Sequence, residues 1–369
     1  MKRLTVLVTV SVVGIMGVIG IASGFGRHRL PAKQGVVLPN VPDTEGVVTL
    51  PNGWKVTPAG HALPLPGDLP LKMQFSPDGK YLSVLMGGYH NHGIHVLDVQ
   101  SEQSVQTVDL AKDWAGMSVD PKTGMAFVSG GGMPSKDFLQ EQKKQKATAQ
   151  QLDSFQKPVL RLQWSDGQWK TLPGLVIAGL PEKERFVAGV AVGKAGELFV
   201  VNTLNDTVYR LEGTTAAVQA KTKVGYRPYG IAVAPDGEQI AVTNWGEKSV
   251  SLLEPKTLKP IARIPVGVHP NELVYGQDGR LFVSNAGSNS VSVIVEGKVT
   301  ETIKTSLDPN APVGSTPDAI ALAPDGSRLY VANAGNNSVA MIDISHAGES
   351  KVLGFIPTGW YPSALAVSP

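Results

Sequence analysis

A short turn-and-strand phrase recurs along this chain, and its spacing constrains the fold more than any other feature. The clearest copy runs from Pro324 to Val339, with the sequence PDGSRLYVANAGNNSV. Related copies start at positions 77, 121, 194, 235 and 277, and Pro369 would open another. Successive starts lie 41 to 47 residues apart, except for one interval of 73. A period in the low forties, built from short strands and turns, is typical of the blades of a β-propeller.

Each repeat contains four strand-like runs. In the copy that starts at position 235, a small apolar run at 230–234 precedes the turn, and further strands are expected at 240–243, 249–253 and 259–266. The Asp-Gly pair between the first two runs suits a hairpin, because Gly tolerates a positive φ. No helical periodicity interrupts the pattern, so the strands are expected to pair antiparallel with their sequence neighbours.

The number of inner strands predicts the number of blades. Inner strands are expected to begin near Leu71, Ala115, Ala188, Gly230, Glu272, Ala319 and Ala364. We therefore predict an all-β, seven-bladed β-propeller of four-stranded antiparallel blades over residues 47–369. The seventh blade has only its inner strand in this sequence, so we expect an incomplete blade and a truncated C-terminus. Residues 54–57 and 61–65 are candidates for an outer strand of that blade.

The interval of 73 residues predicts an insertion in blade two. From Ser135 to Lys157 the sequence contains no Gly or Pro and is rich in Gln, Lys and Ala. These residues favour helix. We predict a helix from Ser135 to about Phe155 that projects from the blade.

The N-terminus predicts export. Lys2 and Arg3 precede an apolar run over residues 4–22, which has the pattern of a secretory signal peptide or an uncleaved N-terminal anchor. We assign residues 1–24 to this segment and 25–46 to a linker. Either outcome places the propeller in the periplasm, outside the cell or on a membrane, and membrane contact is expected only through residues 4–22.

Composition excludes several classes of function. The 33 basic and 31 acidic residues give a formal net charge of +2, and no basic stripe occurs, so we expect no nucleic-acid partner. The chain has no cysteine, which excludes disulfides, thiolate metal sites, lipoprotein acylation and c-type haem attachment. We expect no cofactor and find no catalytic motif in the chain.

The end of the second strand resembles the YVTN-type β-propeller repeat. The matching segments are Phe199–Asn202, Ala241–Asn244, Phe282–Asn285 and Tyr330–Asn333. Blades one and two depart from this pattern, with Met86 and Gly130 at the Asn position.

The segment 50–70 resembles the start of exported bacterial proteins in which such a propeller precedes an alkaline-phosphatase-like phosphoesterase domain. The resemblance implies a phosphoesterase domain beyond Pro369. None of that domain's metal ligands or nucleophile maps onto this sequence.

Repeated polar residues are expected to serve structure. The Asp of each Asp-Gly turn, at 78, 236, 278 and 325, is expected to cap its own turn, because calcium needs six or more oxygens at one point. The Asn that ends each second strand is expected to bond nearby backbone. His90, His92 and His95 are close enough in sequence to suggest zinc or copper, but alternation along a strand turns His95 away, so we predict no metal site.

The residues just before each inner strand form the candidate binding site. They occupy one point of the repeat, so ring geometry brings them to one mouth of the axial channel, while their chemistry varies from blade to blade. The predicted set is Trp114, Arg185, Arg227, Tyr229, His269, Asn271, Asp318, Trp360 and Tyr361. Aromatic rings beside Arg, His and Asn suit a polar or anionic organic ligand, or a protein partner.

The sequence is compatible with two functions. The first is an exported, non-catalytic binding or scaffolding propeller linked to a phosphoesterase. The alternative is a propeller enzyme, a lactonase-like hydrolase or a lyase, that uses the channel mouth. Hydrolysis needs a base near a bound water, and Asp318 and His269 are the candidates.

Overall fold

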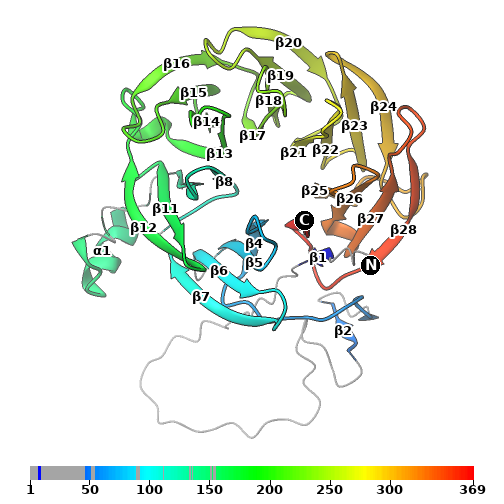
Figure 1. Ribbon diagram of the computed structural model, residues 1–369, viewed down its shortest axis with the longest axis horizontal. Helices are drawn as coiled ribbons and strands as arrows, with labels where there is room; N and C mark the ends of the chain where they lie inside the picture. The colour runs from blue at the N-terminus through cyan, green and yellow to red at the C-terminus, as the bar shows by residue number, and fades with distance from the viewer. Residues whose placement is uncertain are drawn as a thin grey trace, which may run out of the picture.

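The chain folds into a ring of antiparallel sheets around a central axis (Figure 1). The computed structural model describes residues 7–9, 46–50, 55–88, 92–110, 112–132, 134, 136–149, 152 and 155–369. Among these residues, five four-stranded sheets and one five-stranded sheet form six blades, and in each the strands follow one another outward from the axis in sequence order.

The first three blades contain the following strands. Blade one has β4 (Leu69–Phe75), β5 (Tyr81–Gly87), β6 (Gly93–Asp98) and β7 (Gln103–Asp109). Blade two has β8 (Met117–Val119), β9 (Met125–Ser129), β11 (Val159–Ser165) and β12 (Gln168–Leu175). Blade three has β13 (Phe186–Val192), β14 (Leu198–Asn202), β15 (Thr207–Leu211) and β16 (Val218–Lys223), and β10 (Gly131–Gly132) pairs with its inner strand.

The last three blades repeat the plan with less variation. Blade four has β17 (Pro228–Val233), β18 (Ile240–Asn244), β19 (Ser249–Leu253) and β20 (Pro260–Pro265). Blade five has β21 (Pro270–Tyr275), β22 (Leu281–Asn285), β23 (Ser290–Val295) and β24 (Lys298–Lys304). Blade six has β25 (Pro317–Leu322), β26 (Arg328–Asn333), β27 (Ser338–Asp343) and β28 (Lys351–Pro357). Two short 3-10 turns are η1 (Glu182–Glu184) and η2 (Ala334–Asn336).

The prediction of seven blades is wrong, because the structure has six. The seventh inner strand, β29 (Leu365–Val367), pairs with β1 (Leu7–Thr9) in a sheet of two strands. It packs between β25 of blade six and β4 of blade one. Counting repeat starts counts inner strands, and an inner strand can complete the ring without carrying a blade.

The outer strand proposed for that blade is also wrong. β3 (Lys55–Val56) pairs with β2 (Val48–Thr49) in a separate hairpin, and residues 61–65 form no strand. Of residues 1–24, the structure describes only Leu7–Thr9, so most of the predicted signal or anchor lies outside the described residues. The described part of the chain contains no helix that is long and apolar enough to cross a membrane.

The hydrophobic core lies between neighbouring blades. Alternating side chains of each sheet point to opposite faces, so both faces of the central strands are apolar and buried. Phe199 and Val201 of blade three pack against Ile240 and Val242 of blade four, for example. All four are fully buried, and burial of each such side chain contributes about 1.5–3 kcal/mol. Each blade is therefore stable only against its neighbours.

The inner strands approach closely at the axis. A Cβ placed on Gly189 would lie 2.4 Å from the Tyr229 carbonyl oxygen, and one on Gly230 would lie 2.6 Å from the Asn271 carbonyl oxygen. Real Cβ atoms do not come this close to backbone, so glycine is required where one inner strand crosses the next. These contacts set how wide the central channel can be.

The repeated Asp and Asn residues have the structural roles predicted for them. Asp236 Oδ1 accepts a hydrogen bond from the Glu238 backbone N–H at 2.8 Å, which caps the turn. Asn244 Oδ1 accepts one from the Gly225 backbone N–H at 3.0 Å. The amide of the fully buried Asn244 therefore ties the end of the second strand to the segment that leads into the inner strand.

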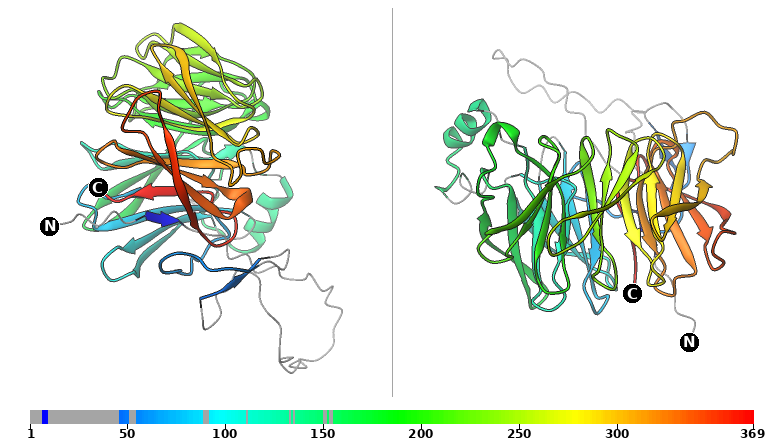
Figure 2. Two further views of the ribbon diagram at one scale, coloured as in Figure 1. Left: turned by 90° about the vertical axis from the view of Figure 1, so that its right-hand side faces the viewer. Right: turned by 90° about the horizontal axis from the view of Figure 1, so that it is seen from above.

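The insertion in blade two, between β9 and β11, contains a helix, as predicted, but a shorter one. α1 (Lys136–Lys144) lies outside the ring (Figures 1 and 2). Backbone hydrogen bonds continue to Gln145, and Lys146 then takes a left-handed conformation with φ 62°, which ends the helix.

Candidate functional site

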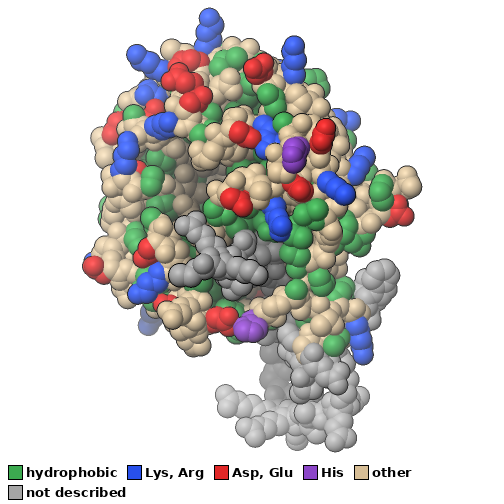
Figure 3. Space-filling view, turned by 45° about the vertical axis from the view of Figure 1, so that its right-hand side comes forward, with side chains coloured by type: hydrophobic (Ala, Val, Ile, Leu, Met, Phe, Trp, Pro, Cys, Tyr) green, Lys and Arg blue, Asp and Glu red, His purple; other side chains and the backbone are tan. Residues whose placement is uncertain are grey.

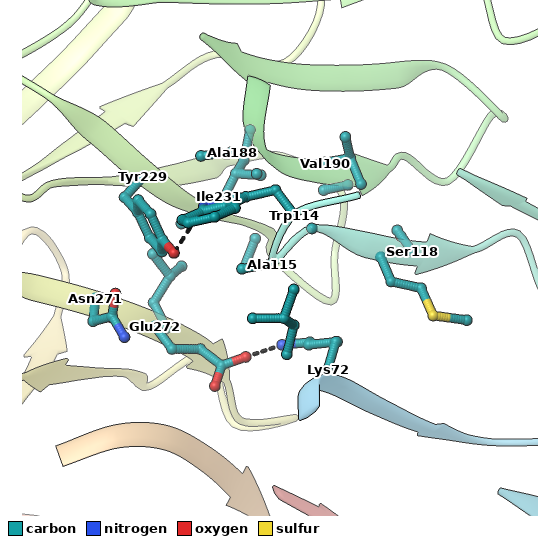
Figure 4. A pocket seen from close by; sticks show the side chains of 18 of the residues that line it. Lys72, Trp114, Ala115, Ser118, Ala188, Val190, Tyr229, Ile231, Asn271 and Glu272 are labelled. Atoms are coloured by element: carbon teal, nitrogen blue, oxygen red, sulfur yellow. Dashed lines mark hydrogen bonds and ion pairs between the residues drawn. The ribbon is translucent and has the colours of Figure 1, made fainter. Parts of the chain in front are cut away.

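A cavity of about 420 Å³ occupies the axis of the ring (Figure 4). Inner strands of blades one to six line it, together with the segment before β29. Five residues of the predicted set lie on its wall, namely Trp114, Tyr229, Asn271, Asp318 and Tyr361. The structure thus brings together side chains from blades two, four, five and six and the last inner strand.

The backbone at the mouth repeats an uncommon conformation. Four of the residues that precede a proline at the start of an inner strand have φ near +50°, and they are Arg227, His269, Thr316 and Tyr361. Left-handed backbone is uncommon for residues other than glycine, so the surroundings must hold it. Asp206 Oδ1 accepts the Arg227 N–H at 2.8 Å, and Asn337 Oδ1 accepts the Tyr361 N–H at 3.0 Å.

A β-bulge follows Pro228, Pro270 and Pro317. The pairing register shifts between Pro228 and Ile231 and between Pro270 and Leu273. A hydroxyl on the second strand accepts the displaced backbone N–H, as Ser284 Oγ does for Glu272 at 3.0 Å. Bulges re-aim side chains, and here the bulged residues line the channel.

Trp114 and Tyr229 are joined across the mouth. The Trp114 indole Nε1–H donates to the Tyr229 phenol oxygen at 3.0 Å (Figure 4). Burial, with a smaller effect of the Asp318 carboxylate, raises the pKa of Tyr229 to about 12. Tyr229 is therefore a neutral phenol at physiological pH, and its own proton is not used by the Trp114 bond.

Asp318 is the acidic group of the mouth. Asn271 Nδ2 donates to a carboxylate oxygen of Asp318 and also to its backbone carbonyl, the latter at 3.1 Å. Asp318 lines the cavity and is partly buried. Burial raises its pKa to about 6, against the opposing effect of the Asn271 hydrogen bond. Such a carboxyl changes charge close to physiological pH.

Lys72 and Glu272 form an ion pair across the channel (Figure 4). They stand at equivalent positions of β4 and β21, two residues after the proline, where the other inner strands have only Gly or Ala. The small residues at this level leave space for the two long side chains. Burial lowers the pKa of Lys72 to about 8.

The ion pair lies at the inner end of the site. Lys72 lines the axial cavity and also a second cavity of about 740 Å³ at the opposite face, beside the Asp278 and Asp325 turns. The pair therefore marks the boundary between the two spaces. Lys72 is the only Lys or Arg among the described residues that line the axial cavity, and its charge is matched by Glu272.

A rim cavity of about 440 Å³ adjoins the axial one. The two share Asn271, Asp318 and Tyr361. His269, also in the predicted set, lines the rim cavity and stacks on Trp245, with ring centroids 4.1 Å apart and planes at 9°. The Asp318 carboxyl thus stands where two spaces meet.

Three residues of the predicted set line neither cavity. Arg185 is buried and its Nη1 donates to the Gln156 carbonyl oxygen. The Arg227 guanidinium lies over the Tyr226 ring, 5.3 Å from its centre. Trp360 is partly buried away from both cavity walls. The two arginines expected to favour an anionic ligand are therefore not placed to do so.

The two described histidines of the predicted cluster, His92 and His95, contact different partners. His90 lies outside the described residues. His92 Nδ1 contacts Asp113 Oδ1 at 3.1 Å, and His95 Nδ1 contacts Thr107 Oγ1 at 3.0 Å. The Asp113 hydrogen bond raises the pKa of His92, and burial lowers that of His95. No group of three or more His, Cys, Asp or Glu side chains in the described structure is arranged to hold a metal ion.

No model of a known protein family matches this chain, and no curated protein matches it. Solved structures do match it. The periplasmic gluconolactonase of Pseudomonas aeruginosa is 18% identical, with a TM-score of 0.64 over 86% of this chain and 92% of that one. The fold is a β-propeller.

Two further propellers show the same likeness. A candidate 6-phosphogluconolactonase of Bacteroides fragilis is 14% identical, with a TM-score of 0.61 over 86% of this chain and 91% of that one. A streptogramin B lyase is 16% identical, with a TM-score of 0.56 over 79% and 84%. At these identities the likeness shows the fold alone.

Lys72, Glu272 and Trp245 line the two cavities but were not predicted from the sequence. Lys72 and Glu272 could have been identified from the sequence, because the described inner strands contain only three charged residues, Lys72, Glu272 and Asp318. Trp245 lies in a loop whose length and polarity match those of its neighbours, so its role depends on the stack with His269.

Proposed function

We propose that this chain is a propeller hydrolase that opens a lactone or a similar ester of a small polar compound in the axial cavity. The observation that carries the proposal is the Asp318 carboxyl, which stands on the wall of both cavities with its pKa raised to about 6. A general base is most effective when its pKa lies near the working pH. The lactonases among the structural neighbours make a lactone the first substrate class to test.

In this mechanism the Asp318 carboxylate takes a proton from a water molecule as the water oxygen bonds to the lactone carbonyl carbon. The carbonyl electron pair moves to its oxygen, which accepts a hydrogen bond from the Tyr229 hydroxyl. Collapse of this intermediate breaks the ring C–O bond, and the leaving oxygen takes the proton back from Asp318. The product is a hydroxy acid, which ionises and releases one proton to solution.

The site also suits the polar part of such a substrate. Sugar-like lactones carry hydroxyl groups and are uncharged. The axial cavity offers Asn271 and Tyr361 for hydrogen bonds and has the cation Lys72 matched by Glu272. Charged residues of both signs are interspersed over the visible face of the molecule (Figure 3), so no single-sign field selects a charged substrate there.

The test is proton release in a pH-stat with glucono-δ-lactone and 6-phosphoglucono-δ-lactone, corrected for spontaneous hydrolysis. Asp318→Asn keeps the shape and the acceptor for Asn271 but removes the base, so it should lower kcat at least about 100-fold. Asp325→Asn, in an exposed turn at the opposite face, is the matched control and should keep the wild-type rate. A wild-type rate in Asp318→Asn would refute the assigned base.

Non-catalytic ligand binding is the second candidate. It is favoured by the Lys72–Glu272 ion pair and the Asn271–Asp318 hydrogen bond, because these groups can hold polar ligand groups without any chemistry. Saturable binding of sugar lactones or their open acids by calorimetry, with no proton release above background, would support this candidate over hydrolysis.

Export, the YVTN-type repeat family and a phosphoesterase domain beyond Pro369 remain proposals. Export is supported by the apolar run at 4–22. The sequence of the gene beyond Pro369 tests the phosphoesterase, and the cellular fraction that contains the protein tests export.

A further inference from the structure

We propose that the rim cavity binds a second ring of the substrate, so that the preferred substrate is a lactone or ester with two rings. The inference rests on the proposed hydrolase function and extends it to the substrate class. The second ring is uncharged and has an apolar face, as an aryl group or a sugar ring does.

Continuity of the two cavities is the first argument. The axial cavity has about 420 Å³ and the rim cavity about 440 Å³, and Asn271, Asp318 and Tyr361 belong to both walls. Cavities of roughly 300–1,000 Å³ hold drug-sized ligands, so one sugar ring leaves much of the combined space empty. A ligand that fills both cavities keeps its lactone ring beside Asp318 and places its second ring in the rim cavity.

The wall of the rim cavity is the second argument. Trp245 stacks on His269 with planes at 9°, and the indole remains 40% exposed. A Cβ on Gly287 would lie 3.0 Å from His269 Nδ1, so glycine leaves room for the imidazole in this stack. Flat aromatic surface held in place in this way matches the apolar face of another ring.

Charge decides which kind of ring fits. Among the described residues that line the rim cavity there is no Lys or Arg, and Asp318 is the only carboxyl. A phosphate or carboxylate on the second ring would face Asp318 without a cation to offset the repulsion. A neutral ring meets no such penalty, and exposed Val313 adds apolar surface beside it.

The activity test compares substrates of one and two rings. Glucono-δ-lactone has one ring. The δ-lactone of maltobionic acid adds a sugar as the second ring, and a phenyl-substituted butyrolactone adds an aryl group. Trp245→Ala should lower kcat/KM for a two-ring substrate about tenfold more than for glucono-δ-lactone, the scale of one lost apolar pocket contact. The sugar and aryl arms then show which ring is preferred.

Tyr226→Ala is the matched control. Tyr226 is an aromatic residue in the connection between β16 and β17. It is 54% exposed and lines neither cavity. It should leave the ratio of kcat/KM between two-ring and one-ring substrates unchanged. An equal effect of Trp245→Ala on all three substrates would overturn the second subsite.

A binding readout separates this inference from the hydrolase proposal. Wild type and Trp245→Phe are titrated with maltose and with phenyl β-glucoside while tryptophan fluorescence is recorded. A saturable change in the wild type that is lost in Trp245→Phe supports the subsite even without turnover. No Trp245-dependent change with either probe, together with no preference for two rings, overturns it.

Discussion

The Trp114 indole of blade two donates a hydrogen bond of 3.0 Å to the Tyr229 phenol of blade four. The two blades are not neighbours, so the bond spans the channel mouth. Because the phenol oxygen accepts this bond, the Tyr229 proton remains for another acceptor. A pKa raised to about 12 keeps that proton in place at neutral pH.

Loss of the Tyr229 hydroxyl should slow the chemical step. Tyr229→Phe keeps the ring and removes the donor to the carbonyl oxygen, so kcat for lactone hydrolysis is expected to fall about 10- to 100-fold, with a smaller change in KM. Trp114→Phe removes only the hydrogen bond to the phenol, which is then free to rotate, and should lower kcat less than Tyr229→Phe does. Steady-state kinetics on both variants checks the order, and an unchanged kcat in Tyr229→Phe would exclude this role.

Because Lys72 and Glu272 form an ion pair, the effects of replacing them on the free energy of unfolding are expected to be non-additive. Glu272→Ala or Lys72→Ala leaves one charge in the channel without its partner. Each variant is expected to lower the free energy of unfolding by about 1–2 kcal/mol, which is less than for an ion pair shielded from water, because water reaches the channel. The double variant places Ala at both positions, as Ala319 and Ala364 do in other inner strands. Its loss in urea unfolding should be smaller than the sum of the single losses. Strict additivity would show that the pair is not coupled.

His92 predicts a pH-dependent contribution to stability. His92→Ala removes the partner of the buried Asp113 carboxyl, at an expected cost of about 1–3 kcal/mol. The Asp113 hydrogen bond raises the pKa of His92, while burial raises the pKa of Asp113 to about 6. Without His92 the Asp113 carboxyl is a buried, unpaired anion at pH 8 but is largely protonated at pH 5.5, so the loss in unfolding free energy should be larger at pH 8 than at pH 5.5.

His61→Ala is the control for this comparison. His61 pairs with Glu102 at 3.0 Å, but its side chain is 77% exposed, so the pair should contribute little at either pH. Equal losses for the two histidine variants would contradict the role given to burial.

The repeat could be read from the sequence, while the directions of side chains could not. Equivalent positions gave the inner strands and placed Asn271 and Asp318 at one mouth. Arg227 and His269 share the same left-handed backbone, yet His269 faces the rim cavity and Arg227 lies over Tyr226. A repeat position determines backbone geometry, and local contacts decide where a long side chain goes.

The predicted number of blades was wrong for a related reason. The repeat phrase marks where an inner strand begins, and β29 satisfies it although, among the described strands, it pairs only with β1. Lys72 and Glu272 could have been found, because they replace Gly or Ala at one repeated position with opposite charges.

Ionisation of Asp318 should oppose folding. Its folded pKa is raised to about 6, so its contribution is favourable at low pH and is lost as pH rises through that value. Asp318→Asn should therefore raise the melting temperature relative to wild type at pH 7.5, by a few degrees, and raise it less at pH 4.5. Thermal unfolding at both pH values checks this sign, and stabilisation confined to pH 4.5 would reverse it.

The pH dependence of kcat/KM for lactone hydrolysis tests the central claim most directly, because it reports the pKa of the essential base in the free enzyme. With Asp318 as that base, kcat/KM should rise tenfold per pH unit below about pH 6 and level off above it, in line with the raised pKa of this carboxyl. Asp318→Asn should remove this limb together with most of the rate. A wild-type profile that stays flat between pH 4.5 and 8, or a limb near pH 6 that persists in Asp318→Asn, would contradict the account.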